Sequence, residues 1–469
     1  MTSEHNKEKA ISLGNDWTID MKTERGIERR TIVQGATWTI PAAALAVATP
    51  AFAASPAPTL AFTQSSYSGT ACGTITGVQV KRTVDGTAPD PGKTVSVTLA
   101  DGYTFADGTT TYSGTTDANG LITLPDIKVP AKGGNSNFSA SSDSLAATAP
   151  VTAPTNAGDL YSYQNSKASK AGATNVAKVV ADGTGSVYAV TKDGKLVNAA
   201  GTEIDTGLDS TNDNVLAIAS NFPVYIKDGV LYQYQNGTVS KAGATNVAKV
   251  VTDGTGQVYA ITKDGKLVNA AGTQVDDKVL NSTSGLDSTN DQVLTFARDN
   301  NNNVFPVYIK DGDLYTYQNG KAAKAGATNV AKVFADGTGS VYAVTKDGKL
   351  VTSDGKTEID SGLDSTNDKV LAIATNFPVY IKDGVLYQYQ NGTVSATGAT
   401  NVAKVVTDGT GQVYAITKDG KLVNAAGTQV DDKVLNSTSG LDSTNDQVLA
   451  VARDSNNTAF PVYIGPPSC

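Results

Sequence analysis

Short apolar runs separated by turn residues fill residues 159–464 and predict a chain of β-strands. A Thr-Asn pair followed within three residues by an apolar run occurs eight times, in steps of 34 to 44 residues. Two repeat types alternate, one containing NVAKVV and the other NVLAIA. A fixed period of this length is typical of architectures in which each repeat is one supersecondary unit. The Asn residues of the pairs are Asn175, Asn212, Asn246, Asn290, Asn329, Asn367, Asn401 and Asn445.

Each repeat predicts four short antiparallel strands. In the first repeat the strands are expected at 176–181, 186–192, 195–199 and 202–205. Asp193-Gly194 in this repeat and Asp228-Gly229 in the next predict two-residue hairpins, because Asp-Gly supplies the positive φ angles that such hairpins need. Eight four-stranded units predict an eight-bladed β-propeller at residues 159–464.

The two ends of the repeat region complement each other. Residues 158–165 match the third and fourth strands of a repeat, and residues 448–464 match the first and second. One sheet built two-plus-two from both ends would close the ring and remove its open edges. Gly243–Leu294 and Gly398–Leu449 are identical over 52 residues, so four repeats were copied as a block.

Residues 54–146 predict a separate β-sandwich, because short strand-like runs alternate there with Gly, Asp and Asn turns. Strands are expected at 74–80, 93–99, 120–124 and 136–140. The segment Ser113–Gly120 resembles the strand–turn signature of bacterial Ig-like domains of the invasin type, which implies a spacer or stalk. Residues 147–158, rich in Ala, Thr and Pro, predict a short stiff linker. The chain is therefore expected to be all-β.

Residues 1–53 predict a signal peptide. A charged start leads to Arg29-Arg30, then to a mostly apolar run and to Ala51-Phe52-Ala53, which fits an A-x-A cleavage site. The apolar run is too weak for a membrane span. The Arg pair resembles a twin-arginine signal of an actinobacterial-type leader, with an ordinary secretory signal as the alternative. We expect a secreted or extracellular, cell-wall-associated protein, and the tail at 465–469 carries no sortase-type signal.

Composition argues against most kinds of catalysis. The formal charge of -8 argues against nucleic acid as a partner. The single His, both Met and both Trp lie before residue 54, so cleavage leaves none of them, with 31 of the 37 basic and 39 of the 45 acidic residues. Without His, no His acid–base catalysis, His metal site or Ser-His-Asp triad can form.

Two cysteines remain after cleavage. In an oxidising compartment, Cys72 and Cys469 predict a disulfide. Two unpaired thiols, or an intermolecular bond through Cys469, are the alternatives.

The links between the predicted blades carry the first set of candidate ligand-binding residues. In an up-and-down blade, the Leu-Asp-Ser-Thr-Asn-Asp links share one face with the Lys-Asp-Gly turns. Four such clusters suit calcium or sugar hydroxyls, and the alternative is that these side chains cap the links. The residues are Asp209, Asn212, Asp213, Asp287, Asn290, Asp291, Asp364, Asn367, Asp368, Asp442, Asn445 and Asp446.

Tyrosines form the second candidate set. Sixteen of the 19 lie in the repeats, some as pairs on one strand face. The pairs Tyr232/Tyr234 and Tyr387/Tyr389 would form platforms for sugar stacking, or would pack between blades in a region without Trp.

Insertions interrupt the repeat symmetry. Asp276–Ser282 and Asp431–Ser437 lengthen two links, and Arg298–Asn303 and Arg453–Asn457 lengthen two hairpins on the opposite face. Loops on a rigid scaffold commonly carry recognition, so these loops are candidates for it.

Two propeller families share local sequence with the repeats. Gly185–Val190 followed by Asp193–Leu196 resembles the blade signature of quinoprotein-type propellers, but that family's docking Trp and vicinal Cys pair are missing, so its dehydrogenase activity is not expected. The Asp-Gly-x-Leu-Tyr pattern at Asp228–Tyr232 resembles tachylectin-like lectin propellers, which implies carbohydrate binding.

The sequence therefore predicts a non-catalytic, monomeric binding protein with a glycan or a surface protein as its partner. Repeated weak sites would act through multivalency. No cofactor is expected, apart from calcium at the Asp/Asn links. The alternatives are a protein-binding adhesin or cell-wall scaffold, and an Asp-based hydrolase or lyase that needs an Asp with a raised pKa.

Overall fold

The computed structural model describes residues 57–469, with gaps at 182–184, 253–255, 276–283, 336–338, 408–410 and 431–437. Earlier in the chain it describes the paired strands β1 (Ile11–Ser12) and β2 (Thr18–Ile19). The chain divides into two units, 1–55 and 56–469. The predicted signal peptide otherwise lies outside the described residues. Within these ranges every regular element is a β-strand, and no helix is long and apolar enough to cross a membrane.

Residues 59–152 form three small sheets, with strand orders β10-β6-β3, β5-β11-β8 and β4-β13-β12-β7-β9. The predicted strand at 74–80 is divided in two, because Gly77 turns the chain with a φ of 71°. The strands are β3 (Thr59–Phe62), β4 (Tyr67–Ser68), β5 (Thr74–Ile75), β6 (Gln79–Thr83), β7 (Thr94–Thr98), β8 (Thr104–Phe105), β9 (Thr111–Thr115), β10 (Leu121–Thr123), β11 (Ile127–Lys128), β12 (Ser136–Ser142) and β13 (Leu145–Thr152).

Strand β13 occupies the first half of the predicted linker at 147–158. It pairs with β12 from Ser142↔Leu145 to Ser136↔Val151. Its side chains alternate between the two faces, and Ala149 and Val151 are buried. The Ala, Thr and Pro residues suggest a linker, but they form a half-buried strand in which small Ala side chains fill inward positions. The connection to the repeats therefore starts only after Thr152.

A buried arginine lies within this small domain. Arg82 on β6 is 4% exposed, and its Nε donates to Asp90 Oδ2 over 2.8 Å. The guanidinium also donates to Asp143 Oδ2 over 2.7 Å and to the Ser142 hydroxyl. Around it, β7 alternates exposed and buried positions, and Val95 and Val97 are fully enclosed in the apolar core. The ion pairs therefore join β6 to the segment before β7 and to the turn between β12 and β13.

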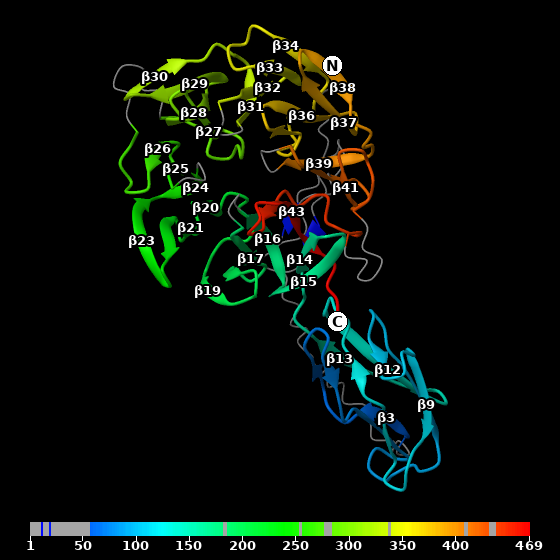
Figure 1. Cartoon of the computed structure of the whole chain (residues 1–469). Helices are drawn as coiled ribbons and strands as arrows, with labels where there is room; N and C mark the ends of the chain where they lie inside the picture. Colours follow the sequence, from blue (N-terminus) through cyan, green and yellow to red (C-terminus); the bar gives the residue numbers. More distant parts are fainter. Residues whose placement is uncertain are drawn as a thin grey trace, which may run out of the picture. The chain divides into compact units, whose positions relative to one another are not determined.

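The described part of residues 159–465 forms eight antiparallel sheets that follow one another along the chain (Figure 1). The strands of the first four are β14 (Asp159–Gln164), β15 (Lys167–Thr174), β42 (Leu449–Arg453) and β43 (Ala459–Gly465); β16 (Val176–Ala181), β17 (Val187–Thr191), β18 (Lys195–Asn198) and β19 (Glu203–Thr206); β20 (Leu216–Ala219), β21 (Phe222–Lys227), β22 (Val230–Gln235) and β23 (Thr238–Thr245); β24 (Val247–Thr252), β25 (Val258–Thr262) and β26 (Leu267–Asn269). The strands of the other four are β27 (Leu294–Arg298), β28 (Val304–Lys310), β29 (Asp313–Gln318) and β30 (Lys321–Lys324); β31 (Val330–Ala335), β32 (Val341–Thr345), β33 (Lys349–Thr352) and β34 (Glu358–Ser361); β35 (Leu371–Ala374), β36 (Phe377–Lys382), β37 (Val385–Gln390) and β38 (Thr393–Ala396); β39 (Val402–Thr407), β40 (Val413–Thr417) and β41 (Leu422–Asn424).

These sheets close into a ring. One sheet has the order β15-β14-β43-β42, so the start and the end of the repeat region complete it together, as predicted. Its central pairing includes Asp159↔Gly465 and Tyr161↔Tyr463. The first strand of each sheet contacts the first strand of the next, from β16 through β39 and β42 back to β16. This arrangement, with the first strands innermost, is that of a β-propeller.

Two kinds of turn join the second and third strands. Asp228-Gly229 forms the predicted two-residue hairpin, with φ angles of 52° and 72°. The expectation for Asp193-Gly194 is wrong, because β17 and β18 are separated by the three residues Lys192–Gly194. The Thr191 hydroxyl accepts the Lys195 N–H over 3.0 Å and lengthens the turn. At its tip Gly194, with a φ of 78°, lies so close to the Leu208 carbonyl that a Cβ would be 2.5 Å from it.

Two sheets depart from the predicted four strands. Within the described residues, β24-β25-β26 and β39-β40-β41 have three strands each. A single bridge, Val268↔Gln274 in one and Val423↔Gln429 in the other, stands where a fourth strand is expected. The inserted links at 276–282 and 431–437 follow these bridges directly and lie outside the described residues.

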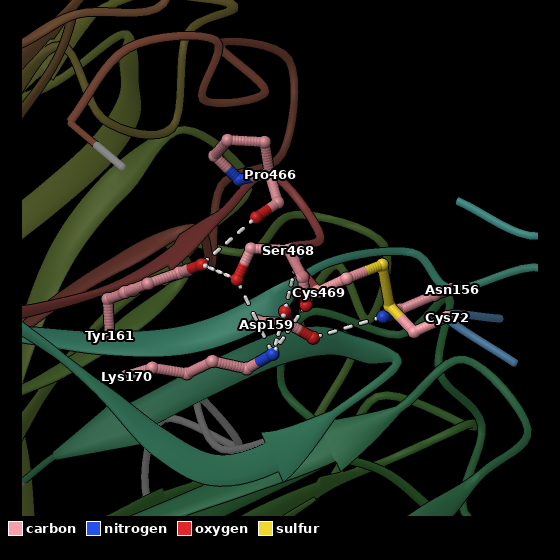
Figure 2. The surroundings of a disulfide bond; sticks show 8 residues. All are labelled: Cys72, Asn156, Asp159, Tyr161, Lys170, Pro466, Ser468 and Cys469. Atoms are coloured by element: carbon pink, nitrogen blue, oxygen red, sulfur yellow. Dashed lines mark hydrogen bonds and ion pairs between the residues drawn. A yellow bond between two sulfur atoms is a disulfide. The ribbon is translucent and has the colours of Figure 1, made fainter. Parts of the chain in front are cut away.

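The predicted disulfide is present and holds the closing segment. Cys72 and Cys469 are bonded, with their Cα atoms 5.4 Å apart (Figure 2). Next to the bond lies Asp159 of β14, which is fully buried. Its Oδ2 pairs with Lys170 Nζ over 2.7 Å and accepts the Ser468 N–H over 2.9 Å. The last residues are therefore tied both to the small domain and to the ring-closing sheet.

Candidate functional site

The first Asp of each link is used in a turn. Asp209 Oδ1 accepts the Thr211 N–H over 2.9 Å and the Thr211 hydroxyl over 2.6 Å. These hydrogen bonds to the charged form hold the pKa of Asp209 below its ordinary value. The equivalent pairs are Asp287 with Thr289, Asp364 with Thr366 and Asp442 with Thr444. In each of the four links, one carboxylate oxygen of the first Asp is therefore already used in hydrogen bonds to the Thr two residues further on.

The Asn of each link joins one sheet to the next. Asn212 Nδ2 donates to the Ala248 carbonyl of β24 over 2.8 Å, and Asn212 Oδ1 accepts the Asn214 N–H. The Asn–Ala pairs that repeat this latch are Asn290–Ala331, Asn367–Ala403 and Asn445–Ala177. The last pair spans 268 residues of sequence and closes the ring.

The second Asp of each link pairs with a lysine from an innermost strand. Lys178, in the run NVAKVV, is 5% exposed and donates to Asp213 Oδ1. The matching pairs are Lys249–Asp291, Lys332–Asp368 and Lys404–Asp446. Each pair connects the first strand of one sheet to the link of the next. A lysine repeated four times inside an otherwise apolar strand was the sequence signal for these pairs, and the prediction of a continuous apolar run overlooked it.

Four equivalent hollows lie where these links meet the next sheet, and we call them the link pockets. Each is lined by a link, by the innermost strand of the next sheet and by that sheet's Lys-Asp-Gly turn. In three of them the turn after the second strand completes the lining, and in the fourth the tail at Pro466-Pro467, Lys132 and Ala157 take its place. Their volumes are about 570, 710, 500 and 710 Å³. The defining link and turn residues are Asp209, Asn212 and Lys263; Asp287, Asn290 and Lys346; Asp364, Asn367 and Lys418; and Asp442, Asn445 and Lys192.

Each link pocket has an apolar floor and a charged rim. In the first pocket, Val215, Ile226 and Val247 line the floor, and Asp228 and Lys263 line the rim. Lys263 Nζ lies 3.7 Å from the position a Cβ would take on the neighbouring Gly229. Across the described ranges, no hydrogen bond or ion pair joins Asp228 or the Lys263 ammonium to another residue. Asp311 with Lys346 and Asp383 with Lys418 repeat this rim, and the pocket of the ring-closing sheet has Pro466 in place of the Asp.

The predicted tyrosine platforms lie elsewhere. Tyr232 stacks on Tyr225 at 5.9 Å between ring centroids, and Tyr387 stacks on Tyr380 at the same distance. Tyr234 and Tyr389 pack against the apolar clusters between neighbouring sheets. None of these four tyrosines lines a link pocket. Packing between sheets accounts for their positions, and sugar stacking on them stays a prediction.

Tyr225 and Tyr380, on which Tyr232 and Tyr387 stack, each donate a hydrogen bond to a carboxylate. Burial and a 2.7 Å hydrogen bond to Asp205 raise the pKa of the Tyr225 hydroxyl. Lys227 pairs with the other oxygen of Asp205 over 2.8 Å. Tyr380, Asp360 and Lys382 repeat the arrangement. These groups brace the second strand rather than face a pocket.

Calcium at the Asp/Asn links also stays a prediction. Over the ranges that the structure describes, no three His, Cys, Asp or Glu side chains gather as a metal site would require. The link carboxylates instead face Thr hydroxyls, backbone N–H groups and lysines.

The described insertions form closed turns. Arg298 Nη1 donates to the Asn302 carbonyl over 3.3 Å, and Asp299 Oδ1 accepts the N–H groups of Asn301 and Asn303. The loop after Arg453 repeats the pattern with Asp454 and Asn457. Any recognition by these loops stays a prediction.

The Lys-Asp-Gly turns give a test by pH. Asp264 pairs with Lys266 Nζ over 2.8 Å, and this hydrogen bond lowers the pKa of Asp264 from 3.8 to about 2. Because the pKa is lower in the folded state, the pairing stabilises the fold above pH 3.8 and is lost as the pH falls towards 2. We expect Lys266→Ala to return the carboxyl pKa of Asp264 towards 3.8 in an NMR titration.

The copied repeat supplies the control. Asp419 pairs with Lys421 in the same way, and its pKa is also lowered to about 2. Lys266→Ala should leave the Asp419 titration unchanged. An Asp264 that titrates at 3.8 in the unaltered protein would contradict the pairing.

Comparisons with known proteins found solved structures that resemble this chain at low sequence identity and low TM-score. No protein-family profile matches, and no curated protein matches. Saccharomyces cerevisiae Sqt1 is 12% identical with a TM-score of 0.40, over 66% of this chain and 99% of Sqt1. PorZ, a bacterial surface component of the type-IX secretion system of Porphyromonas gingivalis, is 13% identical with a TM-score of 0.35, over 57% of this chain and 39% of PorZ. A quinoprotein alcohol dehydrogenase-like protein from Bacteroides thetaiotaomicron is 9% identical with a TM-score of 0.29, over 78% of this chain and 93% of that one. Since each TM-score is below 0.5, the β-propeller fold rests on the strand order and ring contacts of this chain itself.

Proposed function

We propose that the chain is a secreted, non-catalytic glycan-binding protein. Its Ig-like β-sandwich would carry an eight-bladed β-propeller, and the four link pockets would bind repeating units of one polysaccharide. The observation that carries the proposal is the fourfold recurrence of a pocket lined by the link Asp and Asn, with a rim Asp at three of the four. A repeated pocket favours a ligand that is itself repeated, because simultaneous weak contacts multiply affinity.

The rim chemistry supports a hydroxylated ligand. At three of the pockets an Asp carboxylate and a Lys ammonium face the solvent with no partner in the described ranges, as Asp311 and Lys346 do. A carboxylate accepts hydrogen bonds from sugar hydroxyls, and an ammonium donates to their oxygens. The apolar floor between them suits the carbon-bound face of a sugar ring. These charged groups are exposed rather than buried, which does not favour the raised pKa that an Asp-based hydrolase needs.

The proposal is tested with a glycan array that includes wall polysaccharides. Purified residues 54–469 would be probed with calcium and then with a chelator. We expect binding to one class of glycan. Loss of binding with the chelator would assign calcium to the links, and a blank array in both conditions would contradict glycan binding.

Variants of the rim locate the site. Lys263→Ala, Lys346→Ala and Lys418→Ala, combined in one protein, should weaken binding about tenfold or more, because three contacts are lost together. The matched control combines Lys266→Ala, Lys349→Ala and Lys421→Ala, which remove the same charge from the same turns outside the pockets. Equal losses in the two variants would show that net charge, and not the link pockets, governs binding.

A protein partner is the second candidate. Val239 and Val394 are the exposed large apolar side chains of the ring among the described residues, at 37% and 36% exposure. They occupy equivalent places on β23 and β38. An exposed Val on the outer strand of two equivalent sheets would give a protein partner the same apolar contact twice. Val239→Ser with Val394→Ser would abolish such binding and leave glycan binding intact.

A further inference from the structure

The repeat symmetry is broken at two innermost positions that meet in one place. The residue after the second Asp of each link is Asn214, Gln292 or Gln447 in three links, and Lys369 in the fourth. The residue two places after the strand lysine is Val180, Val251 or Val406 in three strands, and Phe334 in the fourth. Neither change follows from the alternation of repeat types.

Lys369 and Phe334 line the same cavity. It has a volume of about 350 Å³ and lies against the innermost strands β31, β35 and β39. Gln292, Asp368 and Thr407 contribute polar groups, and Ile373 and its neighbours contribute apolar wall. This volume is at the lower end of the range for small-molecule sites. Asp368 lines both this cavity and one link pocket, but no link pocket is lined by Lys369 or Phe334.

The carboxylates near Lys369 and the Thr407 hydroxyl are already paired. Asp368 is bound by Lys332, and Asp446 is bound by Lys404. The Thr407 hydroxyl donates to the Ile373 carbonyl over 2.7 Å. In the ranges that the structure describes, the Lys369 ammonium has no hydrogen-bond or ion-pair partner. It is therefore one positive charge in excess over the four Lys–Asp pairs.

Burying this unpaired ammonium is energetically unfavourable. Burial lowers the pKa of Lys369, and the carboxylates of Asp446, Asp213 and Asp368 oppose the shift only in part. A cation withdrawn from water is stabilised when an anion pairs with it. The cavity offers such an anion a place beside an aromatic ring.

We propose that this cavity binds one small organic anion, with its carboxylate at Lys369 and its apolar part against Phe334. The ligand class is an aromatic or branched-chain carboxylate small enough for about 350 Å³. The site is single, in contrast to the four link pockets, and its occupancy does not depend on the proposed glycan.

Benzoate is the probe, and benzyl alcohol and benzylamine are its neutral and cationic counterparts. Calorimetric titration of the full mature chain should show one benzoate site and no site for the counterparts. Lys369→Gln should weaken benzoate binding about tenfold or more, because a charge-assisted hydrogen bond is removed. Phe334→Val should weaken benzoate binding by a smaller factor and leave binding of acetate unchanged.

Both variants carry the residue that the other repeats already have at that position, so the fold should be retained. Lys81→Gln removes a charge from the exposed face of β6 in the small domain and is the matched control. Absence of benzoate binding, equal binding of benzyl alcohol, or unchanged binding by Lys369→Gln would each overturn the proposal. The same variants should also be tested for glycan binding. If they bind glycan normally but do not bind benzoate as expected, the anion site is wrong and the link pockets are unaffected.

Discussion

Replacing Arg82 by Ala should lower the free energy of unfolding of the small β domain by about 3–5 kcal/mol. The guanidinium is 5% exposed and pairs with Asp90, whose side chain is 10% exposed. Without Arg82, the Asp90 carboxylate stays enclosed with no cation, and an unpaired buried charge is strongly destabilising. Differential scanning calorimetry should show a large fall in the unfolding temperature of this domain.

Two comparisons make the result specific. Lys81→Ala, on the exposed face of the same strand, should change the unfolding temperature little. Adding Asp90→Ala to Arg82→Ala should recover part of the loss, because the unpaired carboxylate is then gone. If the double variant loses as much unfolding free energy as the two single variants together, the ion pair is not the cause of the loss.

Replacing Cys72 by Ser should destabilise the chain by about 2–5 kcal/mol. The bond connects residues 397 apart, so its loss frees a very long loop in the unfolded chain. Unfolding would be followed by denaturant titration with circular dichroism, and the bond by the mass of the non-reduced protein.

The second cysteine provides the control for the bond. Cys469→Ser and the double variant should match Cys72→Ser, because each removes the same cross-link. Reductant should destabilise the unaltered protein and leave the variants unchanged. Three variants that differ in stability would point to the individual side chains instead of the cross-link.

Much of the fold could be predicted because the strands of each repeat are encoded by local sequence patterns. The strand at 176–181 and the hairpin at Asp228-Gly229 match the structure, since apolar runs and Asp-Gly turns act locally. The three-residue turn at Lys192–Gly194 could not be predicted from Asp-Gly alone. It depends on the Thr191 hydroxyl and on the approach of the Leu208 carbonyl, which lies fourteen residues further on.

The candidate site was predictable in place but not in its interactions. The links around Asp209 do line pockets together with Lys-Asp-Gly turns, as the shared face predicted. The pairing of Asp213 with Lys178 was missed because the two residues are 35 positions apart, one in a link and the other on an innermost strand. Side chains that meet only after the ring forms leave no local pattern in the sequence.

The ring-closing sheet can form only after the last strands of the repeat region have been made. Tyr161 is made 305 residues before Pro466, whose carbonyl it contacts. Until β43 emerges, β14 has one unpaired edge, and an exposed strand edge promotes association between chains. A chain cut short anywhere in the repeats would keep that edge open however well its other sheets had formed. Only a chain that includes β43 pairs this edge of β14, so the sheet that holds both ends of the repeat region is completed last.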